Sequence, residues 1–416
     1  MIKDMLRLMR LTTVLAAFLA VFQLSTCTEQ DPISKEELLD TDGIHLLLDI
    51  MRTVRERNPD FAGWNDKLTA MDMSERGRTL DSLSAGNKND IELNQMVDHL
   101  LSSDAYSLYY NQFRNIQPET HRRMLLHLPF GWLPSPGNVS QSLYEICQNF
   151  VTVNAWAGQC IEKIDLNRVQ KKAVSWLPSG EYLMPPVHFI MDGNGDAFAR
   201  EGEVCFDLYS LILRKRPSSS RYSGLDGVST ENIEAVLAHE FHHVYARPYL
   251  NHLVEVKGDW KSNWRLKLIR TMASEGLAMH CNPPEGLSRA TKEDSAVVAF
   301  WFRELAGTLA AMDKDSLSEE DMRSWLSSSF HETARGLLRD YMERTYQGEE
   351  LDRQVALHIT DRPSMIYTLG WWMVSRISRL GADKEAYLCL LQEPESLFER
   401  YNTVVADGPD SLKAPA

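Results

Sequence analysis

The sequence predicts an α+β protein that is mainly α-helical, with a small sheet near the middle of the chain. Apolar residues recur with helical spacing before residue 176 and again from Thr230 to about Arg400. Prolines and glycines punctuate the region between these stretches, and two short apolar runs there are typical of buried strands. With 416 residues, 44% of them apolar, the chain can bury a sizeable core without disulfide bonds.

The helical pattern is interrupted by one change of character. We expect helices over Leu38–Asn58, Ile91–Leu101, Thr120–Leu128 and Val139–Lys172, and again after Thr230. Strands are expected at Val187–Met191 and Glu203–Leu208, directly before the second helical region.

The overall charge excludes one class of partner. The formal net charge is −14, and phosphate binding needs a basic surface. We therefore expect no nucleic-acid partner.

The N-terminus has the features of an export signal. A charged start is followed by the apolar run Leu11–Leu24, which is shorter than the roughly 20 residues that span a membrane. The sequence Leu24–Cys27 is similar to a bacterial lipobox, although Thr26 departs from its pattern. We expect an exported, cell-envelope protein with a lipid anchor on Cys27 and no transmembrane helix in the mature chain. The alternative is ordinary signal cleavage nearby, with Cys27 incidental.

The rest of the chain is interpreted as one domain with flexible ends. Residues 1–27 form the signal and lipobox, and residues 28–37 are polar and form a tether. The domain covers residues 38–405, with a helical part over 38–176 and a catalytic part over 177–405. Residues 406–416 are small and polar, which predicts a disordered tail.

Two features have alternative interpretations. Cys147 and Cys160 lie on neighbouring helical stretches, where they form either a bridge or two buried free thiols. The turn Asp192–Asp196 carries alternating oxygen side chains, as calcium loops do, but it lacks the final acidic residue of such a loop. A tight Asn-Gly hairpin turn explains the turn equally well.

A His-Glu-x-x-His motif lies in a segment that is predicted to be helical. Ser229 or Thr230 can cap its start, apolar residues follow at helical spacing, and Pro248 is expected to end it. A third histidine, His242, is expected to support the motif or to lie in the core.

The spacing of this motif indicates a metal site. Residues four apart share one face of a helix, so His239 and His243 lie side by side as two ligands of a tetrahedral zinc ion. Glu240 lies beside the metal, where it can take a proton from water that zinc has made acidic. We therefore expect Zn²⁺ as the cofactor.

A catalytic zinc site needs a third protein ligand, and Glu275 is the candidate. It lies in a predicted helix between Ser274 and Gly276, and small residues let two helices approach closely. Glu255 and Asp259 in the intervening segment are rivals, and a solvent-exposed helical glutamate is the other interpretation. The metzincin pattern is excluded, because its glycine and histidine positions hold Ala246 and Tyr249 here.

The two segments together resemble the gluzincin metallopeptidases, in which the third zinc ligand is a glutamate. More narrowly, they resemble an uncharacterised bacterial family of zinc-dependent peptidases, with the resemblance covering Leu38 to Arg400. It implies a zincin-like fold, in which a small sheet precedes the zinc helix and a helix with Tyr367 and Gly370 follows much later. The chain departs from thermolysin at Met279, where thermolysin has the aspartate that orients a zinc histidine.

The resemblance also implies an oxyanion donor and a substrate-binding strand. Gluzincins often take a Tyr or His donor from a later helix, which makes Tyr367 the candidate, with His358 and Arg362 as rivals. The alternative is that Tyr367 is an ordinary core residue. The strand around Val204–Leu208 is expected to bind substrate backbone by strand addition, unless it is an ordinary sheet edge.

These observations predict zinc-dependent hydrolysis of peptide bonds in the cell envelope, with a peptide or protein as the substrate. A zinc amidase acting on cell-wall peptides is the first alternative. A non-catalytic zinc-containing binding protein is the second, and a fourth protein ligand would favour it.

Overall fold

The computed structural model describes residues 35–58, 67–68, 71–113, 116–128, 130–131, 139–193, 197–209, 230–250, 259–281, 295–314, 316–322, 362–379, 383–406 and 413–415. The chain divides into two compact units, residues 1–39 and residues 40–416, and the second unit holds the strands β2, β3 and β4 described below and the candidate site. The predicted signal, lipobox and most of the tether lie outside the described residues. No helix in the described ranges is long and apolar enough to cross a membrane.

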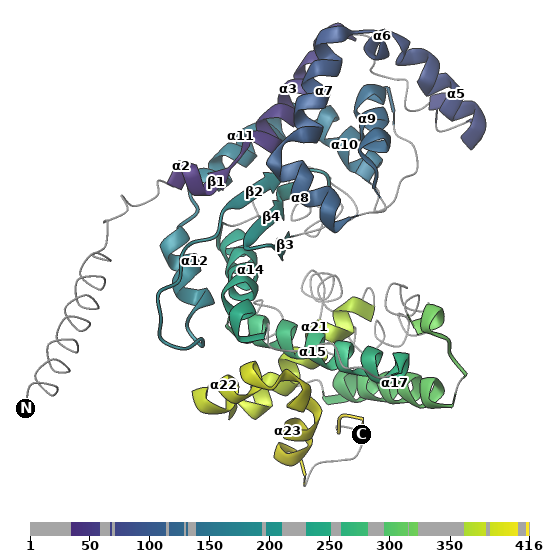
Figure 1. The fold of residues 1–416 in the computed structure, drawn as a ribbon. Coiled ribbons are helices and arrows are strands. Elements are labelled where there is room, and N and C mark those ends of the chain that lie inside the picture. The colour runs from purple at the N-terminus through teal and green to yellow at the C-terminus, as the bar shows by residue number, and fades with distance from the viewer. Residues whose placement is uncertain are drawn as a thin grey trace, which may run out of the picture. The chain divides into compact units, whose positions relative to one another are not determined.

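The fold is mainly helical with a small mixed sheet, as the sequence predicts (Figure 1). The helices that precede the sheet in the second unit are α3 (Asp42–Arg57), α5 (Met73–Leu83), α6 (Ala85–Lys88), α7 (Ile91–Ser102), α8 (Asp104–Gln112), α9 (Pro118–His127), α10 (Val139–Gln148), α11 (Phe150–Glu162) and α12 (Leu166–Ala173). The short helix α2 (Lys35–Leu38) belongs to the first unit.

Local signals explain where these helices begin. The side chains of Asp72, Asp90, Ser103 and Asp165 each accept a hydrogen bond from a backbone N–H in the first turn of α5, α7, α8 and α12. This satisfies amides that have no partner within the helix. The predicted helix over Val139–Lys172 is divided into three helices, with breaks near Asn149 and Asp165.

The sheet has the strand order β1-β2-β4-β3. The strands are β1 (Leu39–Asp40), β2 (Val187–Ile190), β3 (Ala197–Arg200) and β4 (Glu203–Asp207). β2 and β4 run parallel, and β3 runs antiparallel to β4, with Ala197 opposite Phe206. The β3–β4 turn has positive φ at Glu201 and Gly202, 55° and 95°.

The strand predicted at Glu203–Leu208 is β4, but the strand order corrects the prediction that a substrate adds to it around Val204–Leu208. β4 lies in the interior of the sheet and pairs with β2 on one side and with β3 on the other. It therefore has no open edge for strand addition by a substrate. The sequence prediction lacked β3, which is one of the two edge strands of the described sheet, the other being β1.

The helices that follow the sheet carry the candidate site. They are α14 (Thr230–Leu250), α15 (Trp260–Cys281), α17 (Ser295–Asp313), α21 (Arg362–Ile377), α22 (Lys384–Gln392), the short 3-10 helix η4 (Pro394–Ser396) and α23 (Leu397–Val404). α14 runs through Pro248 to Leu250, so the prediction that Pro248 ends this helix was wrong. A proline in the last turn removes a single helical hydrogen bond, which the end of a helix tolerates.

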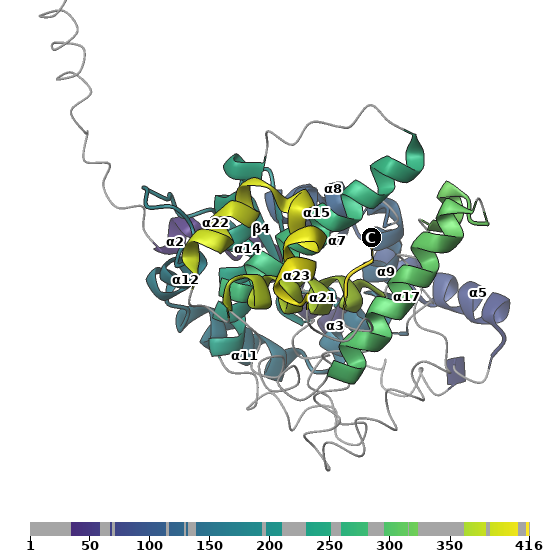
Figure 2. The ribbon, with the colours of Figure 1, turned by 90° about the horizontal axis from the view of Figure 1, so that it is seen from below.

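Two glycines set the contact between α15 and α21 (Figures 1 and 2). A Cβ atom built on Gly276 would lie 2.3 Å from the backbone of Gly370, and one built on Gly370 would lie 2.2 Å from the Met272 carbonyl oxygen. The two backbones therefore touch at a separation that only glycine permits. Because Gly276 follows Glu275 directly, this contact fixes α15 against α21 next to the candidate metal ligand.

Other predicted features have a place in the described chain. Cys147, Cys160, Cys205, Cys281 and Cys389 are free thiols, so Cys147 and Cys160 form no bridge. Of the candidate calcium turn, residues 194–196 lie outside the described residues. The Asp192 carboxyl is buried, and its backbone N–H donates to Asp207 Oδ1 at 3.2 Å. Within the tail, Ala414 exchanges two hydrogen bonds with the side chain of Asn402.

Candidate metal centre

The histidines of the motif lie on one face of α14. Ile233, Leu237 and Phe241 are fully buried on the helix, which fixes how it is rotated about its axis. His239 and His243 face the other way, and their side chains are 16% and 18% exposed. Their Nε2 atoms are 3.0 Å apart, as the four-residue spacing predicts.

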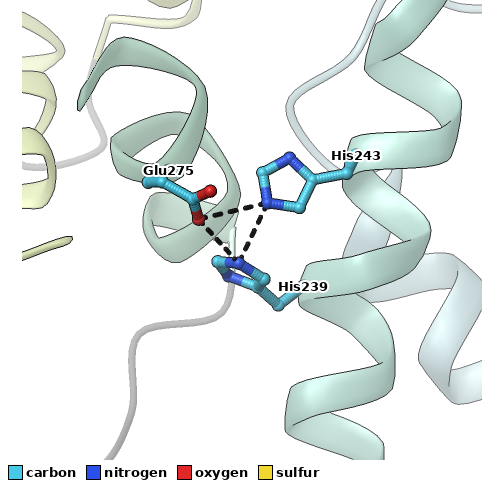
Figure 3. Close-up of side chains that lie close together, drawn as sticks. All are labelled: His239, His243 and Glu275. Atoms are coloured by element: carbon cyan, nitrogen blue, oxygen red, sulfur yellow. Dashed lines mark hydrogen bonds and ion pairs between the residues drawn. The ribbon is translucent and has the colours of Figure 1, made fainter. Parts of the chain in front are cut away.

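Glu275 of α15 completes a cluster with these histidines (Figure 3). Its Oε2 atom lies 3.1 Å from His239 Nε2 and 3.2 Å from His243 Nε2. The three candidate ligand atoms all lie within 4.8 Å of one another. Among the described residues, no other group of three such side chains comes together in this way.

The geometry of this cluster fits a divalent cation. One proton can bridge only two of the three ligand atoms, whereas a cation at their centre accepts a lone pair from each of them. Two histidines and one glutamate are also the protein ligands of known catalytic zinc sites. The residues present therefore suit zinc.

The cluster is electrostatically coupled even without a cation. Burial lowers the pKa of His243, but the charge and hydrogen bond of Glu275 outweigh it and raise that pKa to about 9. Burial raises the pKa of Glu275, and both histidines together bring it well below its usual range. Negative charge on Glu275 is thus strongly favoured at neutral pH, as a metal ligand requires.

Glu240 lies next to the cluster but faces the sheet. Its carboxyl is almost fully buried and accepts a hydrogen bond from the backbone N–H of Ala199 in β3. Burial raises the pKa of Glu240, while the two histidines of the cluster act against this shift. A carboxyl with a raised pKa exchanges protons more readily near neutral pH, which suits a general base.

Ser274 contacts the far side of a cluster histidine. Its Oγ atom lies 3.3 Å from Nδ1 of His243, the ring nitrogen that faces away from Glu275. A partner at this nitrogen fixes the ring orientation and the tautomer of a metal-binding histidine. The Ser274 hydroxyl is therefore placed where it can fix the orientation of the His243 ring.

His242 points away from the cluster into the core. Its Nδ1 atom lies 2.9 Å from the Ala173 carbonyl oxygen, and its Nε2 atom lies 3.1 Å from the Tyr387 hydroxyl. Burial lowers the pKa of His242 to about 3, so its ring is neutral at physiological pH. It ties α14 to α12 and α22, in agreement with the prediction that it supports the motif rather than binding metal.

A pocket of about 960 Å³ opens beside the cluster. Glu240, His243 and Glu275 line it together with Ala197, Phe198 and Ala199 of β3. Tyr367 of α21 lines it as well, with its ring centroid 6.3 Å from that of His239. Because 39% of Tyr367 is exposed, it is not an ordinary core residue.

The rival candidates for these roles lie elsewhere. Asp259 caps α15 by accepting hydrogen bonds from the backbone N–H groups of Lys261 and Ser262, and it is absent from the cluster. Glu255 and His358 lie outside the described residues, and so does the side chain of Arg362.

Sequence reasoning missed several residues that line the pocket. Lys267 and Arg270 on α15 are two of them, and Phe198 on β3 is a third. Two helical steps of four residues back from Glu275 lead to Lys267, and one such step back from Ser274 leads to Arg270. Phe198 had no comparable signal, because β3 is only four residues long.

The fold and the site together define a mainly helical protein in which two histidines and a glutamate converge from two helices beside a pocket. A family model described as "Putative zinc dependent peptidase (DUF5700)" matches residues 97–408, which include every residue of the cluster. The chain belongs to this family, and its cofactor is zinc. No curated protein and no solved structure matches the chain.

Proposed function

We propose that the protein is a gluzincin-type peptidase of the cell envelope that hydrolyses peptide bonds with a water molecule activated at the His239–His243–Glu275 centre. One observation carries the proposal. Three ligand atoms converge within 4.8 Å at the wall of a pocket that Glu240 also lines. Membership of a zinc-dependent peptidase family supports the same reaction class.

The roles of the residues depend on their positions. When bound, zinc supplies a Lewis acid that polarises the scissile carbonyl and makes water acidic. Glu240 takes the proton from the attacking water and delivers it to the leaving amine, and burial keeps its pKa raised for this task. The Ala199 N–H holds the Glu240 carboxylate in place through its hydrogen bond. Ser274 holds the ring of His243.

Tyr367 is the proposed donor to the oxyanion of the tetrahedral intermediate. It stands on a separate helix, α21, and lines the pocket close to His239. The Gly276–Gly370 contact keeps α21 at a fixed distance from α15, and Gly370 lies three residues after Tyr367. A hydroxyl on a rigid element provides stabilisation that needs no rearrangement during the reaction.

The edge strand β3 is the proposed platform for the substrate backbone. Among the described strands, β3 pairs with β4 alone, along one of its sides. Ala197, Phe198 and Ala199 of β3 line the pocket. An extended peptide can add to such an edge by main-chain hydrogen bonds. This proposal transfers the strand-addition role from β4 to β3.

The reaction is tested by metal analysis and by digestion of a peptide library, read by mass spectrometry. We expect about one zinc per chain and cleavage that stops when zinc is chelated. Glu240→Gln should keep zinc and lose at least about 100-fold in kcat/KM. Glu231→Gln, an exposed position on the same helix, is the matched control and should behave as wild type. Full activity in Glu240→Gln would overturn the proposal.

The same experiment separates the alternatives. Cleavage of cell-wall peptides but not of protein-derived peptides would identify an amidase. Zinc binding without any cleavage would identify a binding protein, and in that case a fourth protein ligand is expected.

The envelope location is proposed from Met1–Cys27 alone. Cell fractionation should find the protein in the membrane fraction, and Cys27→Ser should release it from that fraction. Wild-type protein found in the cytoplasm would contradict this part of the proposal.

A further inference from the structure

Two basic side chains on α15, Lys267 and Arg270, line the pocket. Lys267, Arg270, Thr271 and Ser274 line the pocket together with Glu275. The steps from 267 to 270 and 274, and from 267 to 271 and 275, are of three or four residues, so these side chains form one stripe along the helix. The stripe begins with positive charge and ends at the metal cluster. Leu250, Leu266 and Pro394 flank it with apolar surface.

The acidic and basic residues of the described pocket lining lie at different ends of this stripe. The acidic residues among the described pocket lining are Glu240 and Glu275, and both belong to the metal end. Arg270 Nε lies 3.8 Å from Glu395 Oε2 in a partly exposed ion pair. Within the described chain, the exposed Lys267 ammonium forms no ion pair with a carboxylate. Among the described lining residues away from the metal, the charged side chains are therefore the two cations Lys267 and Arg270.

The helix spacing sets the reach of these cations. Arg270 precedes Glu275 by five residues and Lys267 precedes it by eight, which correspond to about 7.5 Å and about 12 Å along the axis at roughly 1.5 Å per residue. An extended peptide advances roughly 3.3–3.6 Å per residue. A peptide that is held at the metal cluster and runs along α15 would bring a group two residues away close to Arg270, and a group three or four residues away close to Lys267.

We propose that Lys267 and Arg270 form a subsite that binds a carboxylate of the peptide substrate, two to four residues from the cleaved bond. This inference rests on the proposed peptidase function and names the substrate class, which is an acidic peptide. The carboxylate comes from an internal Asp or Glu side chain or from a free C-terminus. Arg270 suits either source, because guanidinium groups bind carboxylates through two parallel hydrogen bonds.

The test uses the zinc-loaded full-length protein and one peptide that the library digest shows to be cleaved. Variants of this peptide carry Glu, Gln or Lys at each position from two to four residues on either side of the cleaved bond. A second set has a free C-terminal acid or a C-terminal amide. We expect kcat/KM to be about 10-fold higher for Glu than for Gln at one or more of these positions, and lowest for Lys. A preference for the free acid over the amide would identify the C-terminus as the source.

Charge reversal provides the decisive comparison. The double variant Lys267→Glu and Arg270→Glu should reverse the order, so that Lys peptides are cleaved faster than Glu peptides. Lys171→Glu with Arg303→Glu is the matched control, because both are exposed residues outside the pocket lining and change the net charge equally. This control should keep the preference for Glu.

Two failures are distinguishable. If peptides are cleaved but neither acidic residues nor a free C-terminus is preferred, the subsite is refuted while the peptidase function stands. The subsite is equally refuted if the double variant keeps the wild-type order. If no peptide is cleaved and Glu240→Gln matches wild type, the peptidase function itself has failed.

Discussion

The contact between Gly276 and Gly370 leads to a sharp prediction, because it positions Glu275 without touching the metal cluster. Replacing Gly370 by alanine adds a Cβ atom 2.2 Å from the Met272 carbonyl oxygen, and this oxygen belongs to the backbone of α15. Ordinary van der Waals contact begins at 3.4 Å. The two helices must therefore move apart by about 1 Å, because a backbone atom cannot rotate away as a side chain can.

This displacement is large compared with what a metal site tolerates. Ligand distances in such sites hold within about 0.2 Å, so a shift of about 1 Å in α15 separates Glu275 from the histidines of α14. We expect zinc affinity to fall by at least about 10-fold. Overpacking should also lower the free energy of unfolding by roughly 1–3 kcal/mol, measured with the metal removed.

Zinc affinity is measured by competition with a chelator, and stability by urea unfolding. Gly158→Ala is the matched control, because a Cβ atom at this helical glycine meets nothing within 4 Å. It should leave zinc affinity unchanged and raise stability by up to about 1 kcal/mol. The reasoning is refuted if Gly370→Ala has the zinc affinity and the stability of wild type.

Two further predictions concern a buried histidine and the partner of a cluster histidine. Burial lowers the pKa of His121 to about 4, against about 6.5 unfolded, so its contribution to stability is complete above pH 6.5 and is lost as the pH falls to 4. The loss in the free energy of unfolding amounts to about 3 kcal/mol at most. In urea unfolding, the stability of His121→Gln should depend less on pH than that of wild type between pH 4 and pH 6.5. The same pH dependence in both proteins would contradict this prediction. Ser274→Ala should lower zinc affinity about 10-fold by removing the partner of His243 Nδ1, and Ser274→Thr should restore most of it, whereas equal affinity in all three proteins would show that the hydroxyl has no such role.

Most of the fold could be predicted because its helices bury regular stripes. α7 spans Ile91–Ser102 against an expected Ile91–Leu101, and α3 lies within the range that its apolar spacing indicates. β2 is buried throughout and β4 is buried from Val204 to Asp207, with apolar residues at most positions of both strands. β3 escaped detection because Ala197–Arg200 is only four residues long and only partly buried along its length. Strand order depends on partners far apart in the chain, so no local pattern reveals that β4 lies inside the sheet.

The metal cluster could be predicted from spacing on α14, but the reason for selecting Glu275 was only partly correct. The small residue after it was expected to bring α15 close to the zinc helix. Gly276 instead packs against Gly370 of α21, and Ser274 is the small residue that contacts α14, through His243. Which helix a small residue approaches is decided by tertiary packing, which a single sequence does not encode locally. The same limit applies to Asp259. Its position before α15 is compatible with a helix cap, which depends only on neighbouring residues, but the sequence does not show how far it lies from His239.

The bonds between His242 and α22 set a lower limit on the length of a functional chain. Every residue assigned a role at the metal centre precedes residue 378, which suggests that the protein can be shortened to that point. Tyr387 lies beyond it, and its hydroxyl contacts His242 Nε2 and Cys281 Sγ at 3.1 Å and 3.3 Å. A truncated chain would leave an imidazole without its partner one residue before His243, at a cost of roughly 1–3 kcal/mol in addition to the lost apolar burial. The smallest active fragment must therefore extend through α22, well past the last residue that the chemistry uses.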